Sequence, residues 1–121
     1  AYDNSVRYTD FVLANMIKTL EAAHINAALV YVSDHGESLG ENGLYLHGIP
    51  YMVAPKEQTT VPMVMWFSPE FKTEYGVNED AIRAKVTSDD VSHDNLYHTV
   101  MGLLKVKGTT YERPYDLSAA P

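Results

Sequence analysis

The feature that most constrains the fold is a pair of short apolar runs separated by a long loop. Residues 27–33 (AALVYVS) and 61–67 (VPMVMWF) are rich in β-branched and aromatic side chains and show no alternation with polar ones. Such runs indicate strands buried on both faces, as in a parallel sheet. Pro62 must lie at the start of its strand or at an edge, because it has no N–H to donate.

A helix is predicted on the N-terminal side of these strands. Residues 4–23 carry apolar side chains three, four or seven positions apart, and Asp3 or Asn4 is the expected N-cap. The apolar positions predict packing against a core. They are Val6, Leu13, Met16, Ile17 and Leu20.

Two more helices are predicted after the second strand. Residues 78–85 (NEDAIRAK) begin with Asn78 as a cap and carry two acidic residues in the first turn, where the helix dipole favours them. Residues 92–106 predict a helix that ends before Gly108. Its expected apolar stripe consists of Leu96, Tyr97, Val100, Leu103 and Leu104. The remaining tail is expected to be extended and to fray at its end.

The order of helix, strand, long loop, strand, helix and helix predicts the α/β class. Two or three strands make a poor sheet with exposed edges, so we expect the chain to be the C-terminal part of a larger α/β domain. Its 121 residues are enough for one core.

Composition excludes several functions. The formal charge is −7, and no cluster of Lys and Arg is present, so a nucleic-acid partner is not expected. The chain has no cysteine, which excludes thiolate metal ligands and leaves the redox compartment undecided. No apolar run approaches the roughly 20 residues needed to cross a bilayer, so any membrane anchor must lie outside these residues.

The loop at residues 34–60 contains two competing motifs. Gly36-Glu37-Ser38-Leu39-Gly40 matches the G-x-S-x-G pattern of a serine-hydrolase nucleophile elbow. That elbow needs a strand ending at the serine and a helix directly after it. Here the predicted strand ends about five residues before Ser38, and a glycine-rich stretch follows instead of a helix. The sequence therefore disfavours Ser38 as a nucleophile.

The second motif is a metal site. Asp34 and His35 follow the first strand at its carboxyl end, where open α/β sheets bind ligands. Gly36 eases the turn there, so both side chains can face one point. Aspartate and histidine suit Zn²⁺, with Mn²⁺ as an alternative. His47 returns at the far end of the loop, where it could bind a second ion or a phosphate.

Other polar residues have less specific interpretations. Glu37 could bind a metal, support a ligand or be a solvated charge, and for Glu41 a solvated charge is favoured. His24 follows the first helix and is expected at the surface. For His93 and His98 we expect a structural or supporting role.

The stretch from Tyr31 to Trp66, with SDHGESLGENG and then YLHG, resembles the lipid A phosphoethanolamine transferases, which include the mobile colistin-resistance enzymes. AYDNSVRYTDFVL before it and SHDNLYHTVMGLL after it resemble segments of the same family in the same order. SDHG alone would indicate only the wider alkaline phosphatase and sulfatase superfamily.

The resemblance implies a fold and an activity. The fold would be part of an alkaline-phosphatase-like α/β/α sandwich, with residues 1–121 as the C-terminal portion of the catalytic domain. The enzyme would use Zn²⁺ to move phosphoethanolamine from phosphatidylethanolamine to lipid A, through a threonine-bound intermediate, and would confer polymyxin resistance. It would act at the periplasmic face of the bacterial inner membrane, held there by N-terminal transmembrane helices that this chain lacks.

The resemblance also implies roles for individual residues. Asp34 and His35 match zinc ligands, His47 matches a catalytic histidine that contacts the phosphoryl group or a second zinc, and Glu37 belongs with His47 in substrate binding. The nucleophile is expected in the upstream remainder of the same enzyme, so the isolated chain would be inactive. The alternatives are another hydrolase of the superfamily, namely a phosphodiesterase, phosphatase or sulfatase, and a catalytically silent metal-binding fragment.

Overall fold

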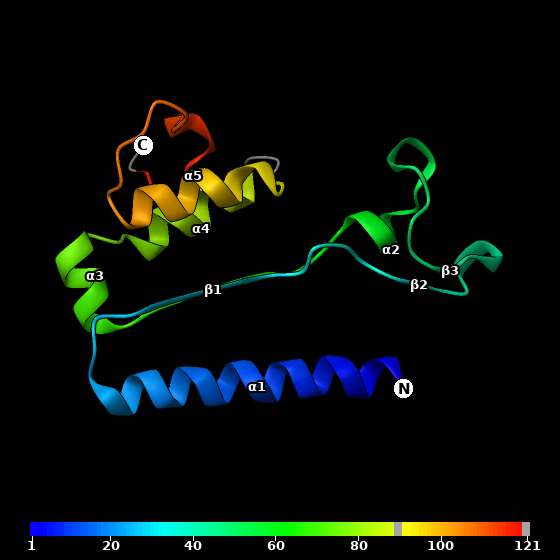
Figure 1. Ribbon diagram of the computed structural model, residues 1–121, viewed down its shortest axis with the longest axis horizontal. Helices are drawn as coiled ribbons and strands as arrows, with labels where there is room; N and C mark the ends of the chain where they lie inside the picture. The colour runs from blue at the N-terminus through cyan, green and yellow to red at the C-terminus, as the bar shows by residue number, and fades with distance from the viewer. Residues whose placement is uncertain (89–90, 120–121) are drawn as a thin grey trace. The chain divides into compact units, whose positions relative to one another are not determined.

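The computed structural model describes residues 1–88 and 91–119 (Figure 1). The chain forms two compact units. Unit 1 consists of Ala1–Ile17 and Ala28–Trp66, and unit 2 consists of Lys18–Ala27 and Phe67–Pro121. None of the helices in the described ranges has the length and hydropathy needed to cross a membrane.

The predicted first helix is α1, Tyr2–Ala23. It begins at Tyr2, and the N–H groups of Asn4 and Ser5 donate to the carbonyl of Ala1, so the prediction of Asp3 or Asn4 as N-cap was wrong. None of its residues is buried, and Val6 and Met16 are half exposed, so the expected core packing of its apolar stripe is not observed.

The two predicted strands are β1, Ala28–Val32, and β4, Met63–Phe67, which pair with each other (Figure 1). The N–H of Ser33 donates to Pro62 O, and the N–H of Ser68 donates to Ala27 O. The end of β1 therefore lies beside the start of β4, so the strands are antiparallel and the parallel arrangement was wrong. Most of their residues are half-buried, not buried on both faces. The apolar runs indicated that strands form but not the direction in which each strand runs.

The 34–60 loop contains short elements that the sequence did not predict. Strands β2, Ser38–Leu39, and β3, Tyr45–Leu46, form an antiparallel hairpin in which Ser38 pairs with Leu46. The 3₁₀ turn η1, Glu41–Gly43, connects the two strands. The turn η2, Tyr51–Val53, and the one-turn helix α2, Lys56–Thr59, complete the loop.

Unit 2 contains a helix that the sequence analysis missed, α3, Pro69–Tyr75. Ser68 caps it by accepting from the N–H of Phe71, Pro69 occupies its first turn, and Gly76 ends it in the left-handed conformation (φ 69°). These are standard helix signals. Phe71 is buried, and its ring stacks on Tyr75 with centroids 4.3 Å apart.

The next helix, α4, Glu79–Ser88, begins as predicted. The carboxamide oxygen of Asn78 accepts from the N–H of Ala81 at 3.0 Å, which confirms Asn78 as the cap. Glu79 and Asp80 lie in the first turn, where negative charge is favourable. The helix ends three residues beyond the predicted stretch.

The last long helix is α5, Asp94–Leu103, and its buried face differs from the predicted one. Leu103 of the predicted stripe is buried, whereas the predicted Tyr97 and Leu104 are about half exposed. The other buried residues of the helix are Asn95 and Thr99. The polar members are buried because they bind the C-terminal segment. Asn95 Nδ2 donates to Tyr115 O, and Thr99 Oγ1 accepts from the N–H of Leu117.

The C-terminal segment is packed on α5 through its 3₁₀ turn η3, Arg113–Tyr115, and through the residues after it. Leu117 is 1% exposed and Asp116 is 2% exposed. The prediction of an extended tail was therefore wrong for residues up to 119. The fraying expected at its end falls on the last two residues, which lie outside the described ranges. The α5 helix ends at Leu103, five residues before the predicted stop at Gly108.

Candidate functional site

The four side chains singled out in the sequence come together in unit 1. The rings of His35 and His47 lie with centroids 4.0 Å apart and planes inclined by 32°. His47 Nδ1 is 3.3 Å from Glu37 Oε2, and His35 Nε2 is 3.7 Å from Asp34 Oδ2. The end of β1 and the end of β3 thus contribute to one site.

The surroundings of His35 determine which ring nitrogen carries the proton. Its Nδ1 lies 2.9 Å from the carbonyl oxygen of Gly36. A carbonyl only accepts, so Nδ1 is the donor, and in the neutral ring Nε2 keeps its lone pair. The carboxylate of Asp34 is 89% exposed and has its Oδ2 on the same side as this lone pair. The pair can therefore bind a cation together.

The two carboxylate oxygens of Glu37 lie in different environments. Oε2 accepts from His47 Nδ1, which leaves His47 Nε2 available to a ligand. Oε1 is buried and has no hydrogen-bond partner among the described residues. A buried carboxylate oxygen without a partner is costly, so it is suited to accept from a ligand.

The site does not contain a full metal-binding set. Within residues 1–88 and 91–119, no three histidine, aspartate or glutamate side chains are arranged to bind one ion. A catalytic zinc site normally has three protein ligands. Asp34 and His35 can therefore supply only part of such a set.

Ser38 is a structural residue here. It is 1% exposed, and its Oγ accepts from Gln58 Nε2 at 2.8 Å. The next elements are a two-residue strand and a turn, not the helix that a nucleophile elbow requires. The structure thus agrees with the disfavoured status of Ser38.

Glu41 is exposed, and its carboxylate also supports the hairpin. Its carboxylate accepts from the N–H of Leu39 at 2.7 Å. Hydrogen bonds from the backbone of Glu41 itself and of Leu39 hold the pKa of this carboxyl below its ordinary value. Glu41 is exposed, which agrees with the expected solvated charge, and its carboxylate has an additional role in the turn.

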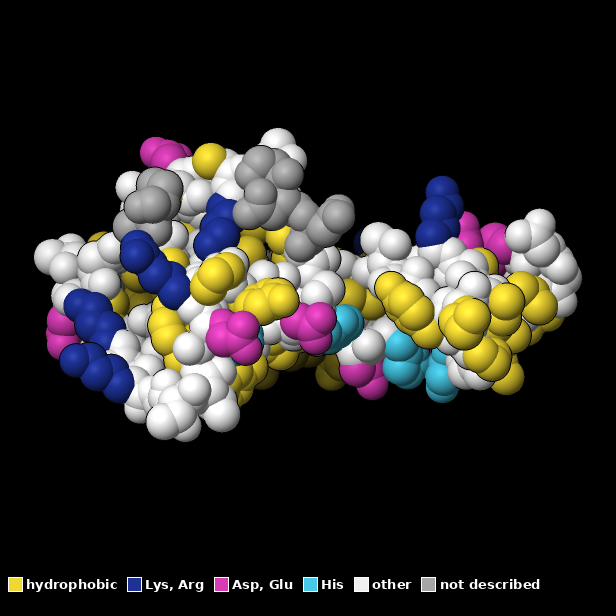
Figure 2. Space-filling view, turned by 90° about the horizontal axis from the view of Figure 1, so that it is seen from above, with side chains coloured by type: hydrophobic (Ala, Val, Ile, Leu, Met, Phe, Trp, Pro, Cys, Tyr) yellow, Lys and Arg dark blue, Asp and Glu magenta, His cyan; other side chains and the backbone are white. Residues whose placement is uncertain are grey.

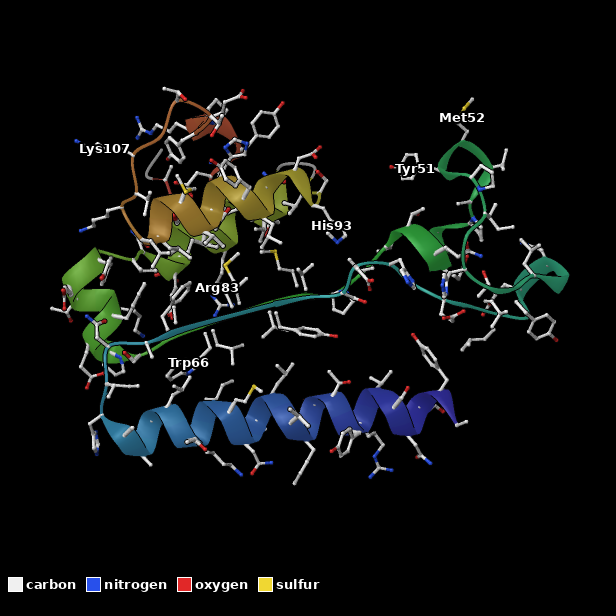
Figure 3. The ribbon with its side chains drawn as sticks, in the orientation of Figure 1. Tyr51, Met52, Trp66, Arg83, His93 and Lys107 are labelled. Carbon is white, nitrogen blue, oxygen red and sulfur yellow. The ribbon has the colours of Figure 1, made fainter. Side chains whose placement is uncertain are left out.

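The other histidines lie outside this cluster. His24 is exposed, as expected, and ends α1 with a positive φ of 50°. His93 is the N-cap residue of α5, although its side chain makes no capping hydrogen bond (Figure 3). His98 Nδ1 accepts from the N–H of Glu112 at 2.9 Å, and its ring stacks on Tyr115. The contacts of His98 fit the expected structural role.

Exposed apolar side chains lie on the same loop as the cluster. Figure 2 shows histidine and hydrophobic side chains next to one another on the surface formed by this loop. Tyr51 and Met52, which are 84% and 95% exposed, project from its far end (Figure 3). Tyr45 and Leu46 are also largely exposed. The histidines therefore lie in an environment that is partly apolar.

Sequence reasoning missed Gln58, which contacts three parts of this loop. Its side-chain amide contacts Ser38 and Ile49, and its main-chain carbonyl oxygen accepts from the N–H of Gly36. The sequence offered one weak signal: Gln58 is the only glutamine in the chain and follows a loop rich in glycine.

Comparison with known proteins identifies the family of the chain. The sulfatase family model matches residues 1–106. Over 118 residues the chain is 42% identical to phosphoethanolamine transferase EptA of Salmonella typhimurium, covering 96% of this chain and 22% of that protein. It is 41% identical to phosphatidylethanolamine transferase Mcr-1 of Escherichia coli, covering 98% of this chain and 20% of that protein. The chain thus spans about a fifth of the curated relatives it matches.

Solved structures agree with these matches. The soluble domain of lipooligosaccharide phosphoethanolamine transferase A from Neisseria meningitidis superposes with a TM-score of 0.90 at 43% identity, covering 97% of this chain and 36% of that one. The periplasmic domain of EptC from Campylobacter jejuni gives a TM-score of 0.80 at 42% identity, covering 96% of this chain and 36% of that one. The predicted α/β class of alkaline-phosphatase type and the predicted resemblance are confirmed. The chain belongs to the sulfatase family, and its relatives there are phosphoethanolamine transferases.

Proposed function

We propose that residues 1–121 are the C-terminal portion of the catalytic domain of a phosphoethanolamine transferase that modifies lipid A. The observation that supports this most directly is the cluster of Asp34, His35, Glu37 and His47 in a chain 42% identical to EptA. The donor would be phosphatidylethanolamine, and the product would confer polymyxin resistance. The proposed location is the periplasmic face of the inner membrane.

We further propose that Asp34 and His35 hold a zinc ion. Two ligands of a tetrahedral zinc with bonds of about 2.1 Å lie about 3.4 Å apart. The observed separation of 3.7 Å between Asp34 Oδ2 and His35 Nε2 is close to this value. Donation by His35 Nδ1 to a backbone carbonyl is also the usual arrangement of a metal-binding histidine. The remaining ligands would come from residues outside this chain. When bound, the ion would stabilise negative charge on the nucleophile and on the phosphoryl oxygens.

The residues of this chain then act on the donor lipid. A threonine supplied from outside residues 1–121 would attack phosphorus, forming one P–O bond and breaking the bond to the diacylglycerol oxygen. In the doubly protonated form of His47, Nδ1 donates to Glu37, and Nε2 can give its proton to that leaving oxygen. The carboxylate of Glu37, whose side chain is 27% exposed, can accept from the ammonium group of ethanolamine. A phosphate oxygen of lipid A would then displace the threonine.

The test is substitution of the two proposed ligands in the complete protein. Asp34→Ala and His35→Ala are each expected to lower phosphoethanolamine transfer to lipid A more than about 100-fold, because losing a ligand costs more than losing its support. Mass spectrometry of lipid A measures the product, and metal analysis measures zinc. His24→Ala, which removes an exposed histidine, is the matched control.

Two outcomes would favour the alternatives. Release of free phosphoethanolamine by the wild type, with no modified lipid A, would indicate a hydrolase of the same superfamily. Zinc binding without turnover in the complete protein would indicate a metal-binding module. Full activity of both ligand variants would contradict the proposed site.

A further inference from the structure

We propose that Gln58 is the positioning residue of this site and fixes His47 and Glu37 against His35. Nothing in the sequence pattern assigns it a role. The inference deepens the proposed function and rests on it for its catalytic consequence, whereas its structural part concerns only unit 1.

The contacts of Gln58 carry the argument. The residue is buried, with 5% of its surface exposed. Nε2 donates to Ser38 Oγ at 2.8 Å, and Oε1 accepts from the N–H of Ile49 at 3.4 Å. The main-chain carbonyl oxygen of Gln58 accepts from the N–H of Gly36 at 2.9 Å. One residue therefore contacts three points that precede it by nine to twenty-two residues.

The three contacted residues lie next to the functional residues of the site in the sequence. Gly36 follows His35 directly, and Ser38 follows Glu37 directly. Ile49 comes two residues after His47. Fixing the backbone N–H groups of Gly36 and Ile49 and the hydroxyl of Ser38 limits the movement of the functional side chains between and beside them.

The hairpin alone would not hold His47 in place. Strands β2 and β3 contribute two residues each, and an isolated hairpin is marginally stable even when it is longer. Leu46, next to His47, also has a positive φ of 65°, which is unfavourable for a branched residue. An additional constraint is needed, and the buried amide of Gln58 supplies it.

The orientation of the amide follows from its partners. The N–H of Ile49 can only donate, so the oxygen of the amide must face it and the nitrogen must face Ser38. A glutamate at position 58 could keep both contacts, because the Ser38 hydroxyl can turn and donate to a carboxylate. A methionine at this position has a similar length and can keep neither.

The test compares these variants by NMR and by transfer activity. In the full chain with labelled histidine rings, wild type should show a ring contact between His35 and His47. Gln58→Met should lose this contact, and Gln58→Glu should retain it. In the complete protein, Gln58→Met should lower kcat for transfer 10- to 100-fold with donor KM changed less than about twofold, as for other residues that orient ligands. Gln58→Glu should recover most of the loss.

Asn95→Leu is the matched control, because it also removes a buried carboxamide, in unit 2. It should leave the ring contact unchanged. If Gln58→Met unfolds the chain, Ser38→Ala removes the same hydrogen bond with a smaller change and should weaken the ring contact.

The outcomes separate the two proposals. An unchanged ring contact and unchanged kcat in Gln58→Met, or equal losses in Gln58→Met and Asn95→Leu, would overturn the positioning role. Loss of the ring contact in Gln58→Met when wild type transfers no phosphoethanolamine would overturn the proposed function and leave the positioning role standing.

Discussion

The two units each contain a buried carboxamide that binds distant backbone, but they use it differently. In unit 2, Asn95 is 7% exposed, accepts from the N–H of Ser92 and donates to Tyr115 O. In unit 1, Gln58 makes the comparable contacts with Ser38 and Ile49. Asn95 holds the C-terminal segment, whose described buried side-chain polar atoms have hydrogen-bond partners. Gln58 holds the 34–60 loop, in which Glu37 Oε1 has none among the described residues.

The difference is visible at single atoms. Asp116 in unit 2 is buried, and its carboxylate accepts from Tyr111 and Ser118. Glu37 Oε1 in unit 1 is the buried side-chain atom without a partner in the described part of the chain. Strain and unpaired polar groups tend to occur where a protein acts on a ligand. The comparison therefore supports unit 1 as the site of chemistry and unit 2 as its structural counterpart.

The largest expected effect is that of Gly36→Ala. A Cβ at this position would lie 2.0 Å from the backbone oxygen of Glu57, which cannot move without shifting α2. We expect unit 1 to lose about 3 kcal/mol or more of stability, because overpacking against backbone cannot relax easily. Hydrogen exchange of the 34–60 loop measures this. Gly43→Ala is the control, since open space surrounds Gly43 and only its positive φ of 76° is penalised. Equal effects of the two substitutions would contradict the close contact.

The second prediction concerns unit 2. Asp116→Ala leaves the Tyr111 hydroxyl and both donors of Ser118 without their acceptor. We expect a loss of about 2 kcal/mol in the stability of unit 2, because partly buried donors would lose a charged partner. Hydrogen exchange at the Leu117 amide reports it, and Glu112→Ala at an exposed position is the control. The ring contact between His35 and His47 should persist. Its loss would show that the two units do not have separate roles.

A smaller effect should appear at alkaline pH. The hydrogen bond to Asp116, together with burial, raises the pKa of the Tyr111 hydroxyl above its ordinary value of 10.0. The neutral form is thus favoured in the folded state. This contribution is fully present below about pH 10 and is lost as the pH rises through the raised pKa. Tyr111→Phe should lower stability by about 1 kcal/mol at neutral pH and remove this alkaline loss. Tyr8→Phe, at an exposed position, should change neither, and an unaltered pH profile in Tyr111→Phe would refute the assignment.

The smallest effect tests backbone strain in the two units. Lys105 follows the end of α5 with a φ of 54°, and Leu46 has a φ of 65°. Glycine at either position relieves a cost of about 1 kcal/mol. Lys105→Gly should raise thermal stability slightly without changing the histidine ring signals. Leu46→Gly should broaden those signals, because it frees the backbone beside His47. Identical spectra for the two variants would remove this distinction between the units.

The sequence predicted elements whose signals are local. Asn78 as a cap could be read from the chain because the cap and its helix are neighbours. The convergence of His35 and His47 also followed from a strand end and a returning loop, although their roles remain predictions. The α3 helix was missed even though Ser68, Pro69 and Gly76 carry its signals.

Features that depend on distant partners could not be predicted. The direction of β4 relative to β1 depends on pairing across more than thirty residues of sequence. The buried face of α5 depends on the C-terminal segment, which converts Asn95 and Thr99 from surface residues into binding residues. The role of Gln58 could not be predicted for the same reason, because its three contacts lie nine to twenty-two residues away in the sequence.

The exposure of Met52 has a consequence for oxidation chemistry. Its thioether is 95% exposed at the tip of the 34–60 loop, while Met16 is 51% exposed. A mild peroxide should therefore convert Met52 to its sulfoxide before Met16. The sulfoxide is polar, so the reaction would change the apolar character of the loop surface without modifying either histidine. A reductase that restores the thioether would make this change reversible.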